Sequence, residues 1–283
     1  KEGIRMEKLK LQKIANEVRK DILTEVFHAK SGHPGGSLSV ADILTCLYFE
    51  EMNVDPADPA KADRDRLVLS KGHATPALYA VLAERGFFPK EELTTLRALG
   101  SRLQGHPNMN DTPGVDMTSG SLGQGVSAAV GMALSAKLTG DPYRVYAVLG
   151  DGELEEGQVW EAMMLAGNKG LDNLVVVVDS NGIQLDGTVE EINSPQPIDE
   201  KMKAFHLHPI VVDGHDFEEL HKAFEEAKTV KGCPTAVIAK TVKGKGVSFM
   251  ENQVSWHGAA PNKEQYEKAM EELEKAGEAL CQM

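Results

Sequence analysis

Two apolar runs separated by a short helical stretch place the strongest constraint on what this chain can fold into. Val145 to Leu149 and Leu174 to Val178 have the composition of strands buried on both faces, and Gln158 to Gly167 between them reads as a helix. A strand, a helix and a strand in this order form a βαβ unit, whose two strands lie parallel. If the strands are neighbours, their carboxyl ends lie about 4.8 Å apart. The residues that follow the two strands therefore converge on one point.

Polar residues follow both strands at that point. Asp151, between Gly150 and Gly152, follows the first strand, and Asn181 follows the second. Glycines let a phosphate approach the backbone, and the N-terminus of the following helix favours negative charge. One carboxylate, one amide oxygen and a diphosphate are ligands that suit Mg²⁺. The spacing therefore predicts a metal-bridged diphosphate site, although a Gly-Asp-Gly sequence alone is also ordinary turn chemistry.

Further segments extend this unit into a larger sheet. Three more strand candidates are Leu67 to Leu69, Pro209 to Val212 and Thr235 to Ala239. Four of the five candidates are apolar without alternation, which is typical of parallel strands covered on both faces. Helical stretches alternate with them, namely Leu9 to His28, Val40 to Phe49, Pro76 to Glu84, Gln124 to Leu138, Phe217 to Lys228 and Glu264 to Leu280. The pattern predicts an α/β fold with a doubly wound, mainly parallel sheet, helices on both faces and a ligand at the carboxyl edge.

Three long stretches show no clear periodicity: Ser101 to Ser119, Gln184 to Glu200 and Lys243 to Pro261. They exceed ordinary loop lengths, so we expect them to be functional. No repeat or linker divides the chain, which predicts a single domain over residues 6–283. Residues 1–5 precede Met6 and could be additions ahead of the native start.

Charge and composition narrow the expected partners. The formal net charge of −13 argues against nucleic acid and against anionic membrane surfaces. No apolar run reaches the ~18 residues that span a bilayer. Three cysteines without metal-type spacing fit a reducing compartment, so we expect a cytoplasmic protein. In so acidic a chain, clusters of basic residues carry more information than usual.

Four of the nine histidines share one setting. His33, His73, His106 and His257 are each next to a glycine and lie at the end of an element or in a long loop. Imidazoles in loops can bind phosphate oxygens or move protons near neutral pH. Any one of them could be an ordinary surface histidine, but the repeated setting favours function. The others lack it and are interpreted as solvated or structural: His28, His206, His208, His215 and His221.

Two glycine-rich segments and an acidic one are further candidates. Gly120 to Gly125 precedes a helix, where glycines let a ring or a phosphate lie against the backbone, although close helix packing explains them equally well. Lys240 to Gly246 places three lysines at the predicted ligand edge, which favours an anion site over a solvated loop. Glu153, Glu155 and Glu156 are expected mostly to favour the next helix N-terminus through its dipole. One of these acids could instead face a partner subunit.

Taken together, these segments resemble the N-terminal, diphosphate-binding half of transketolase. The matching strings run in family order over most of the chain: SGHPGG, VLSKGHATPALYA, GHPN, SGSLGQGVSAAVG, GDGELEEGQVWEA, DSNGIQLDG, AKTVKGKG and VSWHGAAP. The resemblance implies a thiamine-diphosphate-binding fold and ketol transfer between sugar phosphates. It also implies thiamine diphosphate and a divalent metal, Mg²⁺ or Ca²⁺, as cofactors.

The same resemblance implies roles for the matching positions. The implied metal ligands are the side chains of Asp151 and Asn181 and the backbone carbonyl of Ile183. The implied catalytic residues, which would contact substrate, are His33, His106 and His257. The implied cofactor-binding residues are Lys71, His73, Gly120, Ser121, Leu122, Gly152, Glu156, Asn181, Lys243 and His257. In the family, the position of Glu156 helps to link the cofactor sites of two subunits.

The chain departs from the family pattern in two respects. Ser121 stands where the family often has Pro, which loosens the loop but removes no ligand. The sequence also ends at Met283, where full-length transketolase continues into a pyrimidine-binding domain and a third domain. By resemblance, that missing half supplies the glutamate that protonates the aminopyrimidine. We therefore predict a natural split enzyme rather than an engineered fragment, with two of these chains and two C-terminal subunits in a heterotetramer.

Three functions stay open at this point. The first is the transketolase reaction of the pentose phosphate pathway, EC 2.2.1.1, carried out together with a C-terminal subunit. The second keeps the cofactor but transfers a ketol unit from or to another sugar. The third is a non-catalytic, cofactor-binding regulatory subunit. The four histidines argue against the third function, because binding alone does not need proton-transfer groups.

Overall fold

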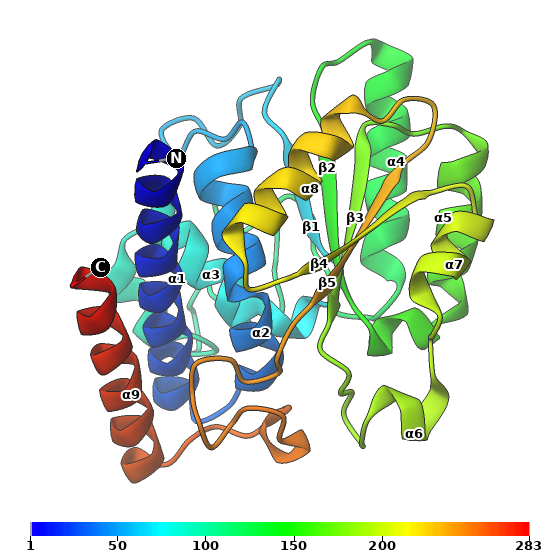
Figure 1. Cartoon of the computed structure of the whole chain (residues 1–283). Coiled ribbons are helices and arrows are strands. Elements are labelled where there is room, and N and C mark those ends of the chain that lie inside the picture. Colours follow the sequence, from blue (N-terminus) through cyan, green and yellow to red (C-terminus); the bar gives the residue numbers. More distant parts are fainter. Residues whose placement is uncertain (1, 283) are drawn as a thin grey trace.

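The computed structural model describes residues 2–282, and side chains from residue 7 onward. Five parallel strands form one sheet in the order β1-β2-β3-β5-β4 (Figure 1). They are β1 (Arg66–Leu69), β2 (Val145–Gly150), β3 (Leu174–Ser180), β4 (His208–Asp213) and β5 (Thr235–Lys240). β2 and β3 are neighbours, with Gly150 opposite Asp179. The predicted strands, their parallel direction and the pairing of the two central strands are confirmed.

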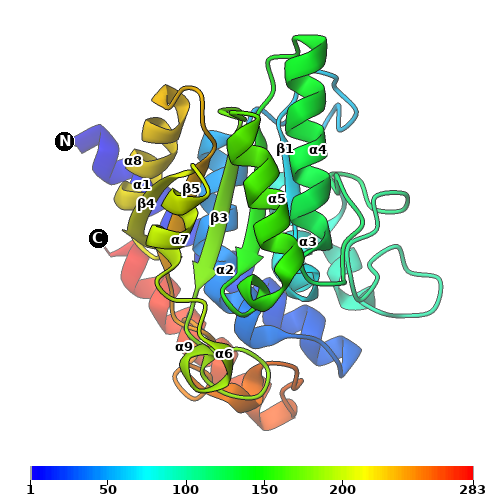
Figure 2. The same ribbon diagram turned by 90° about the vertical axis from the view of Figure 1, so that its right-hand side faces the viewer.

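Helices cover both faces of the sheet, as predicted (Figure 2). One face carries α1 (Glu2–Ala29), α2 (Pro34–Cys46), α3 (Thr75–Arg85) and α8 (Phe217–Thr229). The other face carries α4 (Gln124–Thr139), α5 (Gly157–Asn168) and α7 (Ile198–Ala204). Successive residues of a strand pack into opposite cores because their side chains point alternately to the two faces of the sheet. In β2, Tyr146 and Val148 pack on the first face, and Ala147 and Leu149 pack on the second. Burial on both faces explains why β2, β3 and β5 are apolar along most of their length. The edge strand β4 was predicted to be covered in the same way but is only partly buried, with Val211 52% exposed.

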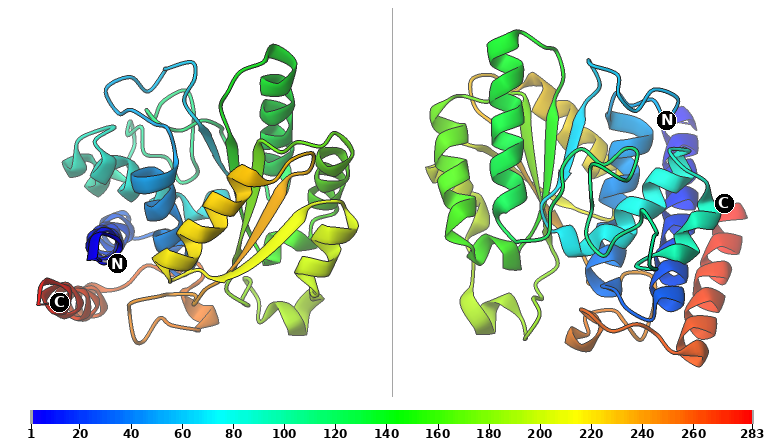
Figure 3. Two further views of the ribbon diagram at one scale, coloured as in Figure 1. Left: turned by 45° about the horizontal axis from the view of Figure 1, so that its top comes forward. Right: turned by 180° about the vertical axis from the view of Figure 1, so that it is seen from behind.

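The last helix, α9 (Lys263–Cys281), packs along α1 and away from the sheet (Figure 3). Asn262 caps its start, and Leu273 is buried against the first core. The side-chain amide of Asn16 on α1 donates to the Leu273 carbonyl at 3.0 Å. Among residues 2–282, no helix combines the length and the apolar character needed to cross a membrane.

The stretch from residue 184 to residue 200 is not irregular, which corrects our prediction. It contains α6 (Val189–Asn193) and the start of α7. The Thr188 hydroxyl accepts the Glu191 amide hydrogen, and the Glu191 side chain accepts the Thr188 amide hydrogen, which starts α6 with a capping box. The two helices have five and seven residues, too few to show a helical period in the sequence.

The second helix begins earlier than predicted, at Pro34 rather than at Val40, and takes both following glycines into its first turn. Proline fits the first turn because its missing N–H has no partner there in any helix. Gly35 is required by a close approach, since a Cβ there would lie 2.8 Å from the Trp256 carbonyl oxygen. The predicted continuation to residue 49 is a short π-helical turn, Leu47–Glu51.

Candidate functional site

The loops that follow β1, β2, β3 and β5 enclose a cleft of about 460 Å³ at the carboxyl edge of the sheet. Most of the residues singled out from the sequence line it: Lys71, His73, Leu122, Asp151, Gly152, Glu156, Asn181, Ile183, Lys243 and His257. These residues are far apart in the chain, and parallel strands bring them together because all their carboxyl ends share one edge. His33, His106, Gly120 and Ser121 lie outside this lining.

Asp151 lies against the turn that holds the other two predicted metal ligands. Its Oδ2 accepts the amide hydrogen of Gly182 at 2.6 Å, and its Oδ1 accepts that of Gly152 at 2.9 Å. In the same turn, Asn181 Oδ1 accepts the amide hydrogen of Ile183 at 3.1 Å. The ends of β2 and β3 therefore meet at the point that the spacing predicted.

The chemistry of this donor set fits a divalent cation. Asp151 is 2% exposed, and burial raises its pKa to about 6 despite the two amide hydrogen bonds. A neighbouring cation would favour the charged carboxylate. The side-chain oxygen of Asn181 and the Ile183 carbonyl complete an all-oxygen set, which Mg²⁺ and Ca²⁺ prefer. The Ile183 carbonyl also accepts a hydrogen bond from Lys243 Nζ at 2.9 Å, and its two lone pairs can serve both partners.

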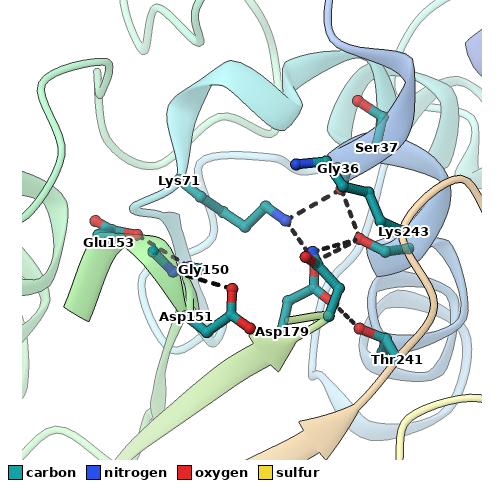
Figure 4. Close-up of polar contacts among 12 residues, drawn as sticks. Gly36, Ser37, Lys71, Gly150, Asp151, Glu153, Asp179, Thr241 and Lys243 are labelled. Atoms are coloured by element: carbon teal, nitrogen blue, oxygen red, sulfur yellow. Dashed lines mark hydrogen bonds and ion pairs between the residues drawn. The ribbon is translucent and has the colours of Figure 1, made fainter. Parts of the chain in front are cut away.

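Lys71 reaches across the base of the cleft to Asp179 (Figure 4). Its ammonium lies 2.5 Å from Asp179 Oδ2 and donates to the Gly36 carbonyl at 3.1 Å. The Ser39 and Thr241 hydroxyls also donate to the Asp179 carboxylate. Burial by itself would raise the pKa of Asp179, but Lys71 and these hydrogen bonds hold it below its ordinary value. Because both members of the ion pair are fully buried, losing either would leave an uncompensated charge.

This buried network was missed from the sequence. Lys71, which we expected to bind the cofactor, lines the cleft, and its charge is matched by Asp179. The available signal was an ionisable residue at the end of an apolar strand, Asp179 after four valines. An acid in that place needs a buried partner, and Lys71 supplies it from the end of β1, on the far side of β2.

Only one of the three lysines in the Lys240 to Gly246 segment enters the cleft. Lys243 is 1% exposed and lines the cleft, whereas Lys240 is exposed, so Lys243 is the lysine of this segment placed for the expected anion site. The Lys243 Nζ bonds the Ile183 carbonyl and lies 2.7 Å from His257 Nδ1. Burial, together with the charge of Lys71, lowers the pKa of Lys243 to about 8. The cleft thus holds one ammonium that no carboxylate in the described contacts neutralises directly.

Three of the four predicted histidines form a cluster beside this lysine. The ring centroids of His33 and His73 are 5.3 Å apart, those of His33 and His257 are 5.6 Å apart, and those of His73 and His257 are 5.2 Å apart. Burial lowers the pKa of His33 to about 4 and that of His257 to about 3, with nearby cations adding to both shifts. Burial also lowers the pKa of His73. At neutral pH the cluster is therefore uncharged, and each ring can both donate and accept a hydrogen bond.

His106 lies beside the glycine-rich segment and is not among the ring contacts of the three-histidine cluster. A Cβ on Gly120 would lie 3.3 Å from the His106 ring, and one on Gly72 would lie 2.8 Å from the Gly120 nitrogen. Gly72 and Gly120 therefore allow these loops to approach each other closely. Leu122 lines the cleft, whereas Ser121 is exposed.

Glu153 corrects our expectation for the acidic segment. It is 2% exposed and accepts hydrogen bonds from Ser70 Oγ at 2.5 Å, from the Gly123 amide at 2.9 Å and from the Gly150 amide at 3.2 Å. It therefore ties together the loops after β1 and β2 and the start of α4, and does not act through the dipole of α5. A single 3₁₀ turn, Gly152–Glu155, directs it inward. Glu156 is exposed beside the cleft, where a partner could contact it.

A family model and several known proteins match this chain. The family model described as transketolase, thiamine diphosphate binding domain, matches residues 10–277. The chain is 47% identical over 271 residues to the 6-deoxy-6-sulfo-D-fructose transketolase subunit SqwG of Clostridium sp. (strain MSTE9), with 96% of this chain and 98% of that protein covered. It is 40% identical to an apulose-4-phosphate transketolase subunit of Phocaeicola vulgatus, with 98% of each covered.

Longer relatives match over part of their length. The transketolase of Rattus norvegicus is 44% identical over 264 residues, which cover 93% of this chain and 42% of that protein. The solved transketolase from Campylobacter jejuni superimposes with a TM-score of 0.88 at 37% identity, again over 93% of this chain and 42% of the other. The chain thus spans nearly the whole of its subunit-length relatives and less than half of these longer transketolases.

Proposed function

Because the chain belongs to the transketolase family, as its thiamine-diphosphate-binding domain, we propose that it is the N-terminal subunit of a two-subunit transketolase. With a C-terminal subunit it would transfer a two-carbon ketol unit from a ketose to an aldose, using thiamine diphosphate and a divalent metal. The observation that carries the proposal is the cleft, where Asp151 faces the Asn181 turn and Lys243 lies beside three uncharged histidines.

Each group in the cleft has a task in this proposal. Bound thiamine diphosphate supplies the nucleophilic carbon that carries the two-carbon unit. The metal would be held by Asp151, Asn181 and the Ile183 carbonyl, and the Lys243 ammonium would neutralise charge on the diphosphate.

The histidines would bind substrate hydroxyls and move protons. We assign His33 the proton exchanged with substrate, because its uncharged ring lies in the histidine cluster against His73 and His257. His257 Nδ1 is already near Lys243 Nζ, which ties its ring to the diphosphate end of the cleft. His106 would contact the donor sugar beyond the cluster.

The preferred sugar is proposed to carry an anionic group. The two subunit-length relatives are named for a sulfo sugar and a sugar phosphate, so the pentose phosphate reaction is one candidate among several. The test is a donor and acceptor screen on the chain co-purified with its C-terminal subunit, using phosphorylated, sulfonated and uncharged ketoses. Ketol transfer with one of the anionic sugars supports the proposal. Tight cofactor binding without transfer from any ketose would point instead to a regulatory subunit.

We predict that His33→Ala and His257→Ala each lower the turnover rate by about 10²-fold or more, the usual scale for proton-handling groups. Both residues lie in loops and outside the two hydrophobic cores, so the melting temperature should change little. Steady-state kinetics and thermal melts on the assembled enzyme check this. His208→Ala, a half-exposed histidine on β4, is the matched control and should leave both quantities near wild type. A melting temperature that falls in proportion to activity would favour a structural role.

A further inference from the structure

His215 lies in the turn between β4 and α8, outside the cleft, and uses both nitrogens of its ring. Nδ1 is 2.7 Å from Oδ2 of Asp42 on α2, and the backbone amide of Val242 donates to Nε2 at 2.9 Å. An amide N–H can only donate, so Nε2 must be the unprotonated nitrogen. The ring proton is then on Nδ1, from which it is donated to Asp42. The geometry therefore fixes the tautomer of His215.

Asp42 is itself held from the other side. Arg19 on α1 forms a bidentate pair with it, at 3.1 Å to Oδ1 and 2.5 Å to Oδ2, and both side chains are nearly fully buried. The same arginine donates through Nε to the Lys245 carbonyl at 3.2 Å. Arg19, Asp42 and His215 thus connect two helices of the first core to the backbone on both sides of Lys243. The contacts of His215 and Arg19 both reach the Lys240 to Gly246 segment. Of the other two lysines in this segment, Lys240 is exposed and Lys245 is half-buried.

We propose that Asp42 and His215 are positioning residues, which fix the Val242 backbone so that Lys243 points into the cleft. Val242 directly precedes Lys243, whose Nζ reaches the Ile183 carbonyl and His257. The His215 acceptor fixes the plane of the Thr241–Val242 peptide, and Arg19 holds the Lys245 carbonyl, so the backbone that carries Lys243 is anchored on both sides. We call Asp42 and His215, together with the Val242 amide that they hold, the clamp. Its existence follows from the hydrogen-bond geometry alone, whereas its effect on a diphosphate rests on the proposed function.

Two substitutions test separately the two hydrogen bonds that the His215 ring makes. In His215→Asn, the side-chain amide can still donate to Asp42 but offers no acceptor to the Val242 amide. In His215→Gln, the longer side chain places its oxygen near the Nε2 position and keeps that acceptor. Hydrogen exchange on the full chain without ligand should show the Val242 amide exchanging about tenfold faster in the Asn variant, the scale of one lost hydrogen bond, and close to the wild-type rate in the Gln variant. His208→Asn is the surface control. Equal exchange in the Asn and Gln variants would overturn the clamp.

The consequence for the cleft is measured with pyrophosphate and Mg²⁺ as the probe, by calorimetric titration of the full chain. The Asn variant should bind about tenfold more weakly, and the Gln variant within about threefold of wild type. In a Lys243→Met background the Asn substitution should have no further effect, because the clamp acts through that lysine. Additive losses, or faster exchange without weaker binding, would show that His215 is merely structural. If wild type itself fails to bind pyrophosphate, the proposed function fails while the exchange result still decides the clamp.

Discussion

Replacing Asp151 by Ala is expected to weaken binding of thiamine diphosphate to the assembled enzyme by at least about 100-fold, or about 2.7 kcal/mol. Asp151 is the one carboxylate in the predicted metal set, and a diphosphate carries several negative charges. Without the carboxylate, the metal would lose its only charged protein ligand and the diphosphate would be poorly neutralised. Calorimetric titration at saturating Mg²⁺ measures the change, and unchanged affinity would remove Asp151 from the metal site.

Asp151→Ala also removes the acceptor for two backbone amides. A second variant must therefore distinguish the effect on loop geometry from the effect on metal binding. Asp151→Asn keeps one acceptor oxygen and loses the charge. If charge on the metal dominates, the Asn and Ala variants should bind the cofactor comparably weakly, while their melting temperatures without ligand differ. If loop geometry dominates, the Asn variant should recover most of the affinity. Asp199→Ala, an exposed acid on α7 outside the cleft lining, is the matched control.

The second large effect concerns the partner. The chain alone, saturated with thiamine diphosphate and Mg²⁺, should show no measurable ketol transfer, and adding the C-terminal subunit should restore it. The cleft residues can hold the diphosphate end, but the rings would remain in water, where electrostatic effects at the reacting centre are weak. Robust turnover by the purified chain would overturn the split-subunit proposal.

The surface of the chain offers a place for that partner. α4 presents small residues outward, with Gly131 exposed, and Leu138 at its end is 79% exposed. On the neighbouring α5, Met164 is 60% and Leu165 44% exposed. We therefore expect α4 to form part of the interface with the C-terminal subunit, and permanent complexes of this kind bury about 2,000 Å² or more.

Gly131→Arg tests this face directly. A Cβ at Gly131 would meet no atom within 4 Å, so the isolated chain should accommodate the side chain, and a helix interior tolerates Arg better than Gly. We expect an unchanged or higher melting temperature for the chain alone and loss of co-purification with the C-terminal subunit, and therefore of activity. Thr229→Arg, at the exposed end of α8 on the other face of the sheet, should leave assembly intact. Assembly that survives Gly131→Arg, measured by light scattering, would exclude α4 from the interface.

Short elements and inward-turning side chains were the features that could not be predicted. α6 and α7 span less than two helical turns each, so their residues carry no detectable period. Glu153 lies in a sequence that reads as an acidic helix start, and only the 3₁₀ turn after Asp151 directs it into the protein. His215, which we interpreted as solvated or structural from its setting, connects α2 to the Lys243 segment over a separation that no local pattern encodes.

The sequence by itself determined the parallel sheet and the edge at which the cleft lies. Uninterrupted apolar runs of strand length are typical of strands covered on both faces, and parallel strands place all their carboxyl ends together. Asp151 and Asn181 could therefore be assigned to one region from their order alone, whereas the glycine-flanked histidines were assigned to it from the family resemblance. Only the tertiary structure decided which charges inside that region are already matched. Lys71 is neutralised by Asp179 and Lys243 is not, because matching depends on which buried side chains come within hydrogen-bonding distance across strands far apart in the chain.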